Sequence, residues 1–157
     1  MQLYELNFQS PTKKLLQALL KSKKIPQVLL FYGPSGTGKR TFAKAFAREL
    51  LHYFSPTKER SDFKLSRETH PDLRYYPSDP KSLSFPIQKV RELIQDIDLA
   101  PFESFCKVFI LEDIEKMLAS SGNLLLKSLE EPPLDTYVIL IASSKTWMAS
   151  CLWPIKR

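Results

Sequence analysis

A glycine-rich run in the first third of the chain carries the residues best suited to bind a phosphate. The run reads Gly-Pro-Ser-Gly-Thr-Gly-Lys-Arg-Thr. Its glycines allow the backbone to turn N–H groups inward around a polyphosphate, and its lysine supplies a point charge for the β- and γ-phosphates. The predicted nucleotide-binding residues are Gly33, Pro34, Ser35, Gly36, Thr37, Gly38, Lys39, Arg40 and Thr41.

One position of this run departs from the pattern G-x-x-x-x-G-K-[ST]. Arg40 stands where the pattern places the hydroxyl that ligates Mg²⁺. Thr41 is a poor substitute, because one step along a helix turns a side chain by about 100°. The sequence therefore predicts nucleotide binding and leaves Mg²⁺ binding and hydrolysis open. A fixed positive charge on Arg40 beside the phosphates would partly replace the cation.

Two adjacent acids, Glu112 and Asp113, are the candidate catalytic residues. They follow an apolar run at 107–111 that has the length of a strand. In P-loop ATPases such a strand ends in an acid that holds Mg²⁺, often followed by an acid that activates water. Here the usual Asp-Glu order is reversed, a displacement of about 1 Å that can lower the rate about a hundredfold. The alternative is that both acids cap the following helix.

The surrounding pattern predicts the elements that position these residues. A short apolar strand at 28–32 precedes the glycine-rich run, and an amphipathic helix follows it. This context favours a P-loop over a glycine-rich turn that binds nothing. Further strands are expected at 72–76, 107–111 and 137–141, and helices from Ser10, at 86–94, with Ile97 continuing its apolar spacing, and at 123–130. Strands alternating with helices predict a three-layer α/β domain with a mainly parallel sheet.

Composition restricts the class of protein further. With 157 residues, 43% hydrophobic and 25% charged, the chain is expected to form one domain over 1–157. It has no apolar run of membrane-spanning length and no signal-peptide pattern at its start, so a cytoplasmic protein is expected. The net charge of +6 suits a polyanionic partner, but the basic residues are scattered. Cys106 and Cys151 lack the spacing of a metal site, so no metal ligands are predicted.

Several longer motifs resemble a known family. Beside the P-loop they are His70-Pro-Asp-Leu73, Val90-Arg-Glu-Leu-Ile94, the segment 107–117 and above all Asn123-Leu-Leu-Leu-Lys-Ser-Leu-Glu-Glu-Pro-Pro133. Together they resemble the AAA+ module of bacterial clamp loaders, and are most similar to the delta-prime branch of DNA polymerase III. That branch helps to load the sliding clamp onto primed DNA in replication, as part of the polymerase holoenzyme. The resemblance implies a stator that binds ATP with little hydrolysis and has motor and clamp-opening subunits as partners.

The resemblance also assigns roles to single residues. Ser143 or Ser144 matches the polar sensor that ends the fourth strand in the family. Arg157 either stands at the arginine finger, which reaches into the neighbouring subunit's ATP site, or lies just before it. Zinc is not expected, because residues 51–70 lack the four cysteines that many relatives carry there. The fifth strand, the lid and the collar domain of the family are not covered, so the domain is expected to be incomplete.

Two other function classes stay open at this point. One is an active P-loop ATPase or small-molecule kinase, although the substrate-binding arginines and arginine-bearing lid of a kinase are not apparent. The other is a nucleotide-free scaffold with a vestigial P-loop. The sequence leaves the oligomeric state, the stoichiometry and direct DNA contact undetermined.

Overall fold

The computed structural model describes residues 10–22, 24–57, 64, 69–77, 79 and 81–143. These residues form a parallel sheet with helices on both faces, as predicted. The elements are α1 (Ser10–Ser22), β1 (Val28–Tyr32), α2 (Lys39–Tyr53), β2 (Leu73–Tyr76), α4 (Ile87–Asp98), β3 (Lys107–Leu111), the 3₁₀ turn η2 (Ile114–Lys116), α5 (Ala119–Glu130) and β4 (Thr136–Ala142).

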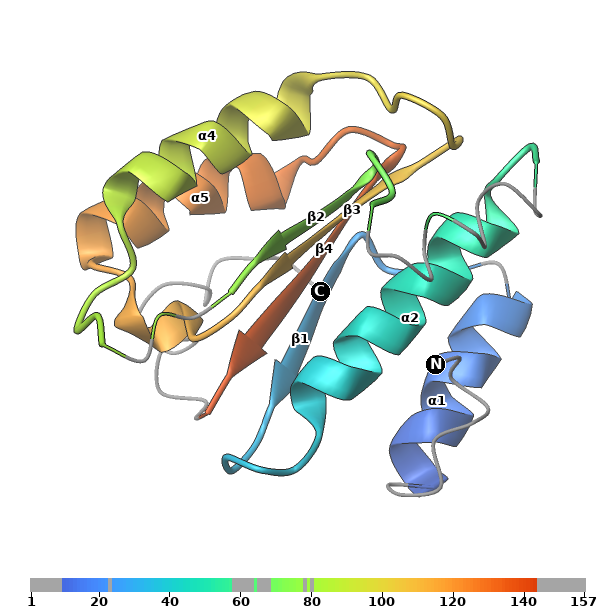
Figure 1. The fold of residues 1–157 in the computed structure, drawn as a ribbon, viewed down its shortest axis with the longest axis horizontal. Coiled ribbons are helices and arrows are strands. Elements are labelled where there is room, and N and C mark those ends of the chain that lie inside the picture. The colour runs from blue at the N-terminus through green and yellow to red at the C-terminus, as the bar shows by residue number, and fades with distance from the viewer. Residues whose placement is uncertain are drawn as a thin grey trace.

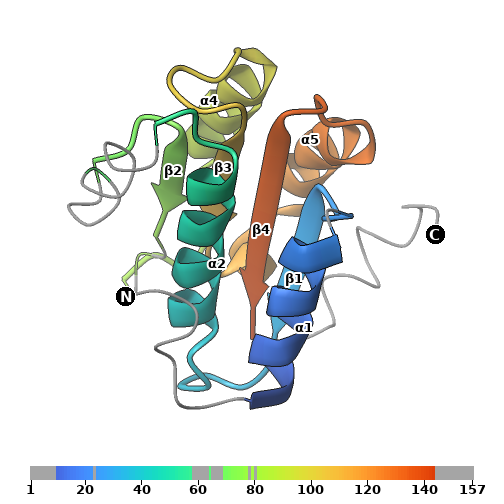
Figure 2. The same ribbon diagram turned by 90° about the vertical axis from the view of Figure 1, so that its right-hand side faces the viewer.

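The sheet has the strand order β1-β4-β3-β2, and every neighbouring pair is parallel. Helices α1 and α2 lie on one face, and α4 and α5 lie on the other (Figure 1). The view turned by 90° looks onto the α1 and α2 face, with α4 and α5 behind the sheet (Figure 2). Because all four strands run the same way, their carboxyl ends share one edge of the sheet. The residues that follow β1, β3 and β4 therefore lie along that edge.

The two central strands supply both halves of the hydrophobic core. In β3, Val108 and Ile110 pack with the cluster on the α2 face, whereas Phe109 and Leu111 pack with the cluster on the α4 and α5 face. Side chains alternate between the faces of a strand, so a strand covered on both sides is apolar throughout. All residues of β3 and β4 are buried, so the residues that follow these strands are held in place at the carboxyl ends of the sheet.

A buried lysine joins β3 to the end of α4. Lys107 is 5% exposed, and its Nζ donates hydrogen bonds to the carbonyl oxygens of Asp96, Ile97 (2.6 Å) and Leu99. Helix C-termini leave carbonyls without intrahelical partners, and a lysine can satisfy them. Burial lowers the pKa of Lys107, while nearby aspartates oppose that shift.

Several boundaries differ from those expected: α4 ends at Asp98, and β4 extends by one residue at each end, from Thr136 to Ala142. Helix α5 begins at Ala119 instead of Asn123, because Ser121 and Gly122 are packed in the interior where apolar periodicity gives no signal. The strand predicted from Asp72 begins at Leu73, because Pro71 and Asp72 lie in a turn that is closed by the Leu73 N–H, which donates to the His70 carbonyl at 3.1 Å. The turn η2 was not expected. None of the helices among the described residues combines the length and apolar character needed to span a bilayer.

Candidate nucleotide site

The glycine-rich run forms a loop between the carboxyl end of β1 and the first turn of α2. Gly36 and Gly38 both have φ of 80°, a left-handed conformation that L side chains rarely adopt. A Cβ added to Gly36 would meet nothing within 4 Å, so the backbone conformation, not lack of space, requires glycine there. The Gly33 N–H donates to the carbonyl of Ala142 at 3.3 Å, which ties the loop to the end of β4.

The lysine of the loop reaches back across it. Lys39 Nζ donates to the carbonyl oxygens of Gly33 at 2.7 Å and Pro34 at 2.8 Å. Thr37 Oγ1 also donates to the Pro34 carbonyl, at 2.9 Å. These acceptors carry no formal charge. The ammonium group is thus held at the mouth of the loop by contacts that a phosphate oxygen can replace or join.

Arg40 forms a bidentate ion pair with Glu112. Arg40 Nη2 donates to Glu112 Oε2 at 2.8 Å, and Arg40 Nε donates to Glu112 Oε1. The Glu112 side chain is 3% exposed and that of Arg40 is 62% exposed, so a buried acid is covered by a cation open to solvent. The hydrogen bond to Glu112 raises the pKa of Arg40 above its ordinary value. The sequence had singled out both residues separately, and the fold brings them together.

The residues of this site do not fit Mg²⁺. Mg²⁺ requires oxygen ligands in near-octahedral geometry, usually one or two carboxylates beside phosphate oxygens and waters. Both oxygens of Glu112 accept from Arg40, and the hydroxyl of the usual pattern is replaced by that same arginine. The part of the chain that the structure describes holds no group of three or more His, Cys, Asp or Glu residues that could bind a metal.

The second acid and the sensor candidate are both engaged with η2. Asp113 has φ of 49° and pairs with Lys116 through Oδ2 and Nζ at 3.0 Å. Asp113 is the residue before η2, but its side chain makes no capping hydrogen bond. The Ser143 backbone N–H donates to Glu115 Oε1 at 2.9 Å, and its hydroxyl donates to the same oxygen. Ser144 and Arg157 lie outside the described residues.

Glu115 is the residue of this region that sequence reasoning missed. It connects η2 to the end of β4 and so fixes Ser143 relative to the acids after β3. Its position two residues after Asp113 gives no signal of such a role. Only the adjacency of β3 and β4 in the sheet brings Glu115 within reach of Ser143.

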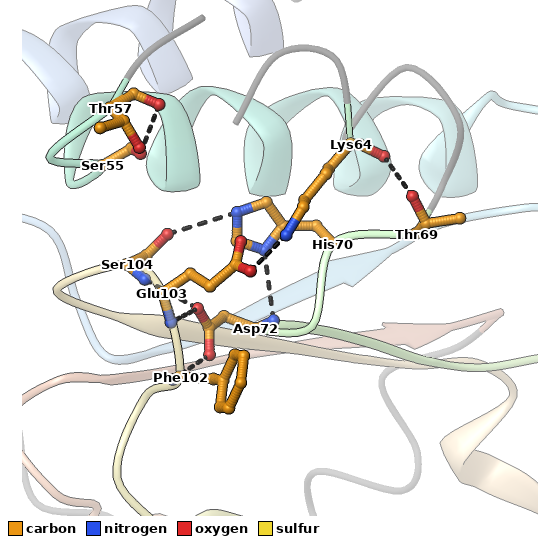
Figure 3. Close-up of polar contacts among 9 residues, drawn as sticks. All are labelled: Ser55, Thr57, Lys64, Thr69, His70, Asp72, Phe102, Glu103 and Ser104. Atoms are coloured by element: carbon orange, nitrogen blue, oxygen red, sulfur yellow. Dashed lines mark hydrogen bonds and ion pairs between the residues drawn. The ribbon is translucent and has the colours of Figure 1, made fainter. Parts of the chain in front are cut away.

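A second polar cluster, of His70, Asp72 and Ser104, lies at the opposite edge of the sheet (Figure 3). The Asp72 carboxylate accepts the backbone N–H groups of Phe102 at 2.6 Å, Glu103 at 2.9 Å and Ser104 at 2.8 Å. Lys64 adds an ion pair to Glu103. The cluster therefore anchors the loop that leads into β3.

These three residue types form the catalytic triad of many hydrolases, but their arrangement here differs. His70 Nδ1 accepts the Asp72 backbone N–H at 3.2 Å, so the ring proton is on Nε2, which faces Ser104 Oγ at 3.4 Å. A protonated Nε2 has no free lone pair to take a proton from serine. Cys106 is no nucleophile either, because burial raises its thiol pKa to about 12. We conclude that the cluster is structural.

Comparisons with known proteins agree with the fold and the motifs. The family model described as "DNA polymerase III, delta subunit" matches residues 8–151. The DNA polymerase III subunit delta' of Pseudomonas aeruginosa is 36% identical over 120 residues, which cover 72% of this chain and 36% of that protein. Subunit delta' of Bacillus subtilis is 30% identical over 132 residues, covering 82% of this chain and 40% of that protein.

A solved structure shows the same fold. The DNA polymerase III gamma subunit-related protein of Thermotoga maritima superposes with a TM-score of 0.58 at 21% identity, covering 90% of this chain and 44% of that one. This chain thus spans less than half the length of the relatives it matches. The family match and the two delta' relatives show that the chain belongs to the DNA polymerase III delta-prime family of AAA+ clamp-loader subunits.

Proposed function

We propose that this chain is the AAA+ module of a clamp-loader subunit that helps to load the sliding clamp onto primed DNA during replication. The observation that carries the proposal is the Arg40–Glu112 pair at the P-loop of a delta-prime family member. The module keeps the phosphate-binding loop of an ATPase while its metal-binding acid is occupied by an arginine. Such a subunit acts by docking against neighbouring subunits and does not drive their movement by hydrolysing ATP.

In this proposal the P-loop binds ATP and turns it over little or not at all. Residues 33–41 hold the phosphates, with Lys39 as the charged donor. Glu112, which in an ATPase would hold the metal, is paired with Arg40, and Asp113, which would activate water, is paired with Lys116. Ser143 is the sensor, with Ser144 beside it, and Glu115 holds Ser143 in place.

The partners in this proposal are the motor and clamp-opening subunits, with the clamp and primed DNA as indirect partners in the cytoplasm. Arg157 is proposed as the finger that completes a neighbouring subunit's ATP site. Family membership favours this role over that of a small-molecule kinase. The scaffold without nucleotide remains the competing hypothesis, and equilibrium ATP binding distinguishes the two.

Reconstitution of the clamp loader tests the proposal. The full-length subunit is combined with its motor and clamp-opening subunits, and assembly, DNA-stimulated ATP hydrolysis and clamp loading are measured with and without it. We expect omission to reduce all three. Unaltered assembly and loading without the subunit would contradict the proposed role.

The same assay with Arg157→Ala tests the arginine finger separately. Loss of such a finger lowers the rate of phosphoryl transfer by about 10³ to 10⁵ in related systems. A silent Arg157→Ala variant in a loader that needs the subunit overturns the finger assignment alone.

A further inference from the structure

We infer that the nucleotide site is metal-independent, with the Arg40 guanidinium taking the place of Mg²⁺ between Glu112 and the phosphates. This inference rests on the proposed nucleotide binding and adds the form in which the ligand binds. The expected ligand is metal-free ATP or ADP. The Mg²⁺ complex, which is the usual ligand of a P-loop, is not favoured.

The first support is the position of the arginine in the loop. Arg40 is the second residue of α2 and follows Lys39 directly. This is the motif position from which a hydroxyl contacts the metal beside the β- and γ-phosphates. Its side chain leads across to Glu112 at the carboxyl end of β3, so it spans from the phosphate loop to the acid.

The second support is the number of donors on a guanidinium. Arginine has five N–H groups, of which Nε–H and one Nη2–H are used for Glu112, leaving three. With 62% of the side chain exposed, these three remain accessible to a phosphate. One planar cation can therefore bind the acid with one edge and phosphate with another. In the usual P-loop site, a metal ion links the acid and the phosphates in the same way.

The third support is charge. Glu112 is 3% exposed, and a buried carboxylate is costly unless it is paired and hydrogen-bonded. If Mg²⁺ entered beside the phosphates, Arg40 would have to leave Glu112, or two cations would meet at one acid. Either change opposes binding of the metal complex, whereas metal-free ATP keeps the pair intact.

Equilibrium binding of a fluorescent ATP analogue, measured with excess EDTA and with excess Mg²⁺, tests the inference in the full chain. We expect the wild-type affinity in Mg²⁺ to equal or fall below that in EDTA. In Arg40→Thr, which restores the usual hydroxyl, affinity in EDTA should fall about tenfold or more, because charge-assisted hydrogen bonds are lost. Added Mg²⁺ should then recover affinity in that variant.

Two further variants separate the geometry of the guanidinium from its charge and from the general charge of α2. Arg40→Lys keeps the charge but lacks the planar fork, so it should bind metal-free ATP less tightly than wild type while remaining folded. Lys44→Thr removes a cation one turn further along α2, where Nζ lies 4.3 Å from the Tyr75 ring centroid. That variant controls for general charge, and its response to Mg²⁺ should match that of wild type.

The outcomes separate this inference from the proposed function. If Mg²⁺ tightens wild-type binding about tenfold or more, the inference fails and nucleotide binding stands. If no analogue binds in either condition, nucleotide binding fails and takes this inference with it. The clamp-loader role is decided by the reconstitution assay in every case.

Discussion

At the scale of single residues, the Arg40–Glu112 ion pair distinguishes this P-loop from the usual pattern. Arg40 stands where the motif has a hydroxyl, and its guanidinium forms two hydrogen bonds with Glu112. Bidentate arginine–carboxylate pairs are among the stronger charge-assisted contacts, and lysine cannot reproduce their planar geometry. The pair therefore stabilises the buried acid and occupies the ligands that hydrolysis requires.

Of the side chains in the loop, Lys39 is predicted to contribute the most to ATP affinity. In Lys39→Ala, a charged donor is removed from the phosphate site. Such hydrogen bonds contribute about 1.5 to 3 kcal/mol, so ATP affinity should fall tenfold or more. Isothermal titration calorimetry measures this, with Lys44→Ala as the matched control. Unchanged affinity in Lys39→Ala would place the nucleotide elsewhere or exclude it.

The sequence predicted the unusual arginine but not its partner. Arg40 could be recognised because a short motif fixes which residue should follow the lysine. Glu112 is 72 positions away, and its contact with Arg40 depends on how β1 and β3 are placed in the sheet. Local sequence patterns do not indicate which distant residue will contact Arg40.

At the scale of elements, a buried carboxylate anchors the loop from Ala100 to Cys106, beside the Lys64–Glu103 ion pair and a hydrogen bond from the Phe105 N–H to the Phe54 carbonyl. Asp72 is 4% exposed and accepts three backbone N–H groups of this loop. A carboxylate accepting several backbone amides satisfies donors that would otherwise be buried without partners. The apolar loop residue Phe102 is 82% exposed, so these hydrogen bonds, not burial of Phe102, fix the loop.

Asp72→Ala is predicted to destabilise the protein by about 2 kcal/mol or more, because three backbone amides, one buried and two partly buried, lose their carboxylate acceptor. Urea unfolding measures the change. Asp79→Ala is the matched control, because exposed Asp79 accepts one backbone N–H, from Lys81 at 2.9 Å. We expect about 0.5 kcal/mol or less for the control. Equal effects of the two substitutions would show that Asp72 does not anchor the loop.

His70 should make stability sensitive to acid. Burial lowers its pKa in the folded state, although Asp72 and Glu103 oppose the shift. The unfolded chain, with an ordinary histidine pKa of about 6.5, then binds a proton that the folded state does not bind. The contribution of His70 to stability is therefore complete above that pH and decreases as pH falls through it toward the folded-state pKa.

This prediction is checked with His70→Asn, which keeps an acceptor for the Asp72 N–H. Urea unfolding of both proteins between pH 7.5 and 5, a range of about one unit or more around the ordinary pKa, gives the comparison. The free energy of unfolding should fall more steeply toward acid in wild type than in the variant. Parallel curves would assign the acid sensitivity to other groups.

The start of α5 shows why element boundaries were harder to predict than element types. The apolar spacing of Leu125, Leu126 and Leu129 predicts a helix, and all three are buried. After Ala119, the first turn consists of Ser120, Ser121 and Gly122, whose helix preference is weak. Ser121, at 0% exposed, and Gly122 are buried by tertiary packing that local sequence does not reveal.

At the scale of the whole molecule, strand order determines which residues meet. Alternation of strands and helices was enough to predict parallel pairing and three layers, since crossover connections require both. The order β1-β4-β3-β2 was not predictable from that alternation. It places β4 between the P-loop strand and the acid strand, so Ala142 contacts Gly33 and Ser143 contacts Glu115.

We propose that this subunit contributes a docking surface and no ATP turnover of its own. The most direct measurement is ATP hydrolysis by a reconstituted loader in which every motor subunit carries a substitution of its own P-loop lysine. In that loader the full-length wild-type subunit has the only unaltered P-loop. As a positive control, the subunit carries Arg40→Thr, Glu112→Asp and Asp113→Glu together, because residues that act on one reaction centre are non-additive. We predict background hydrolysis with the wild-type subunit and a measurable Mg²⁺-dependent rate with the triple variant. Robust Mg²⁺-dependent hydrolysis with the wild-type subunit would contradict the claim.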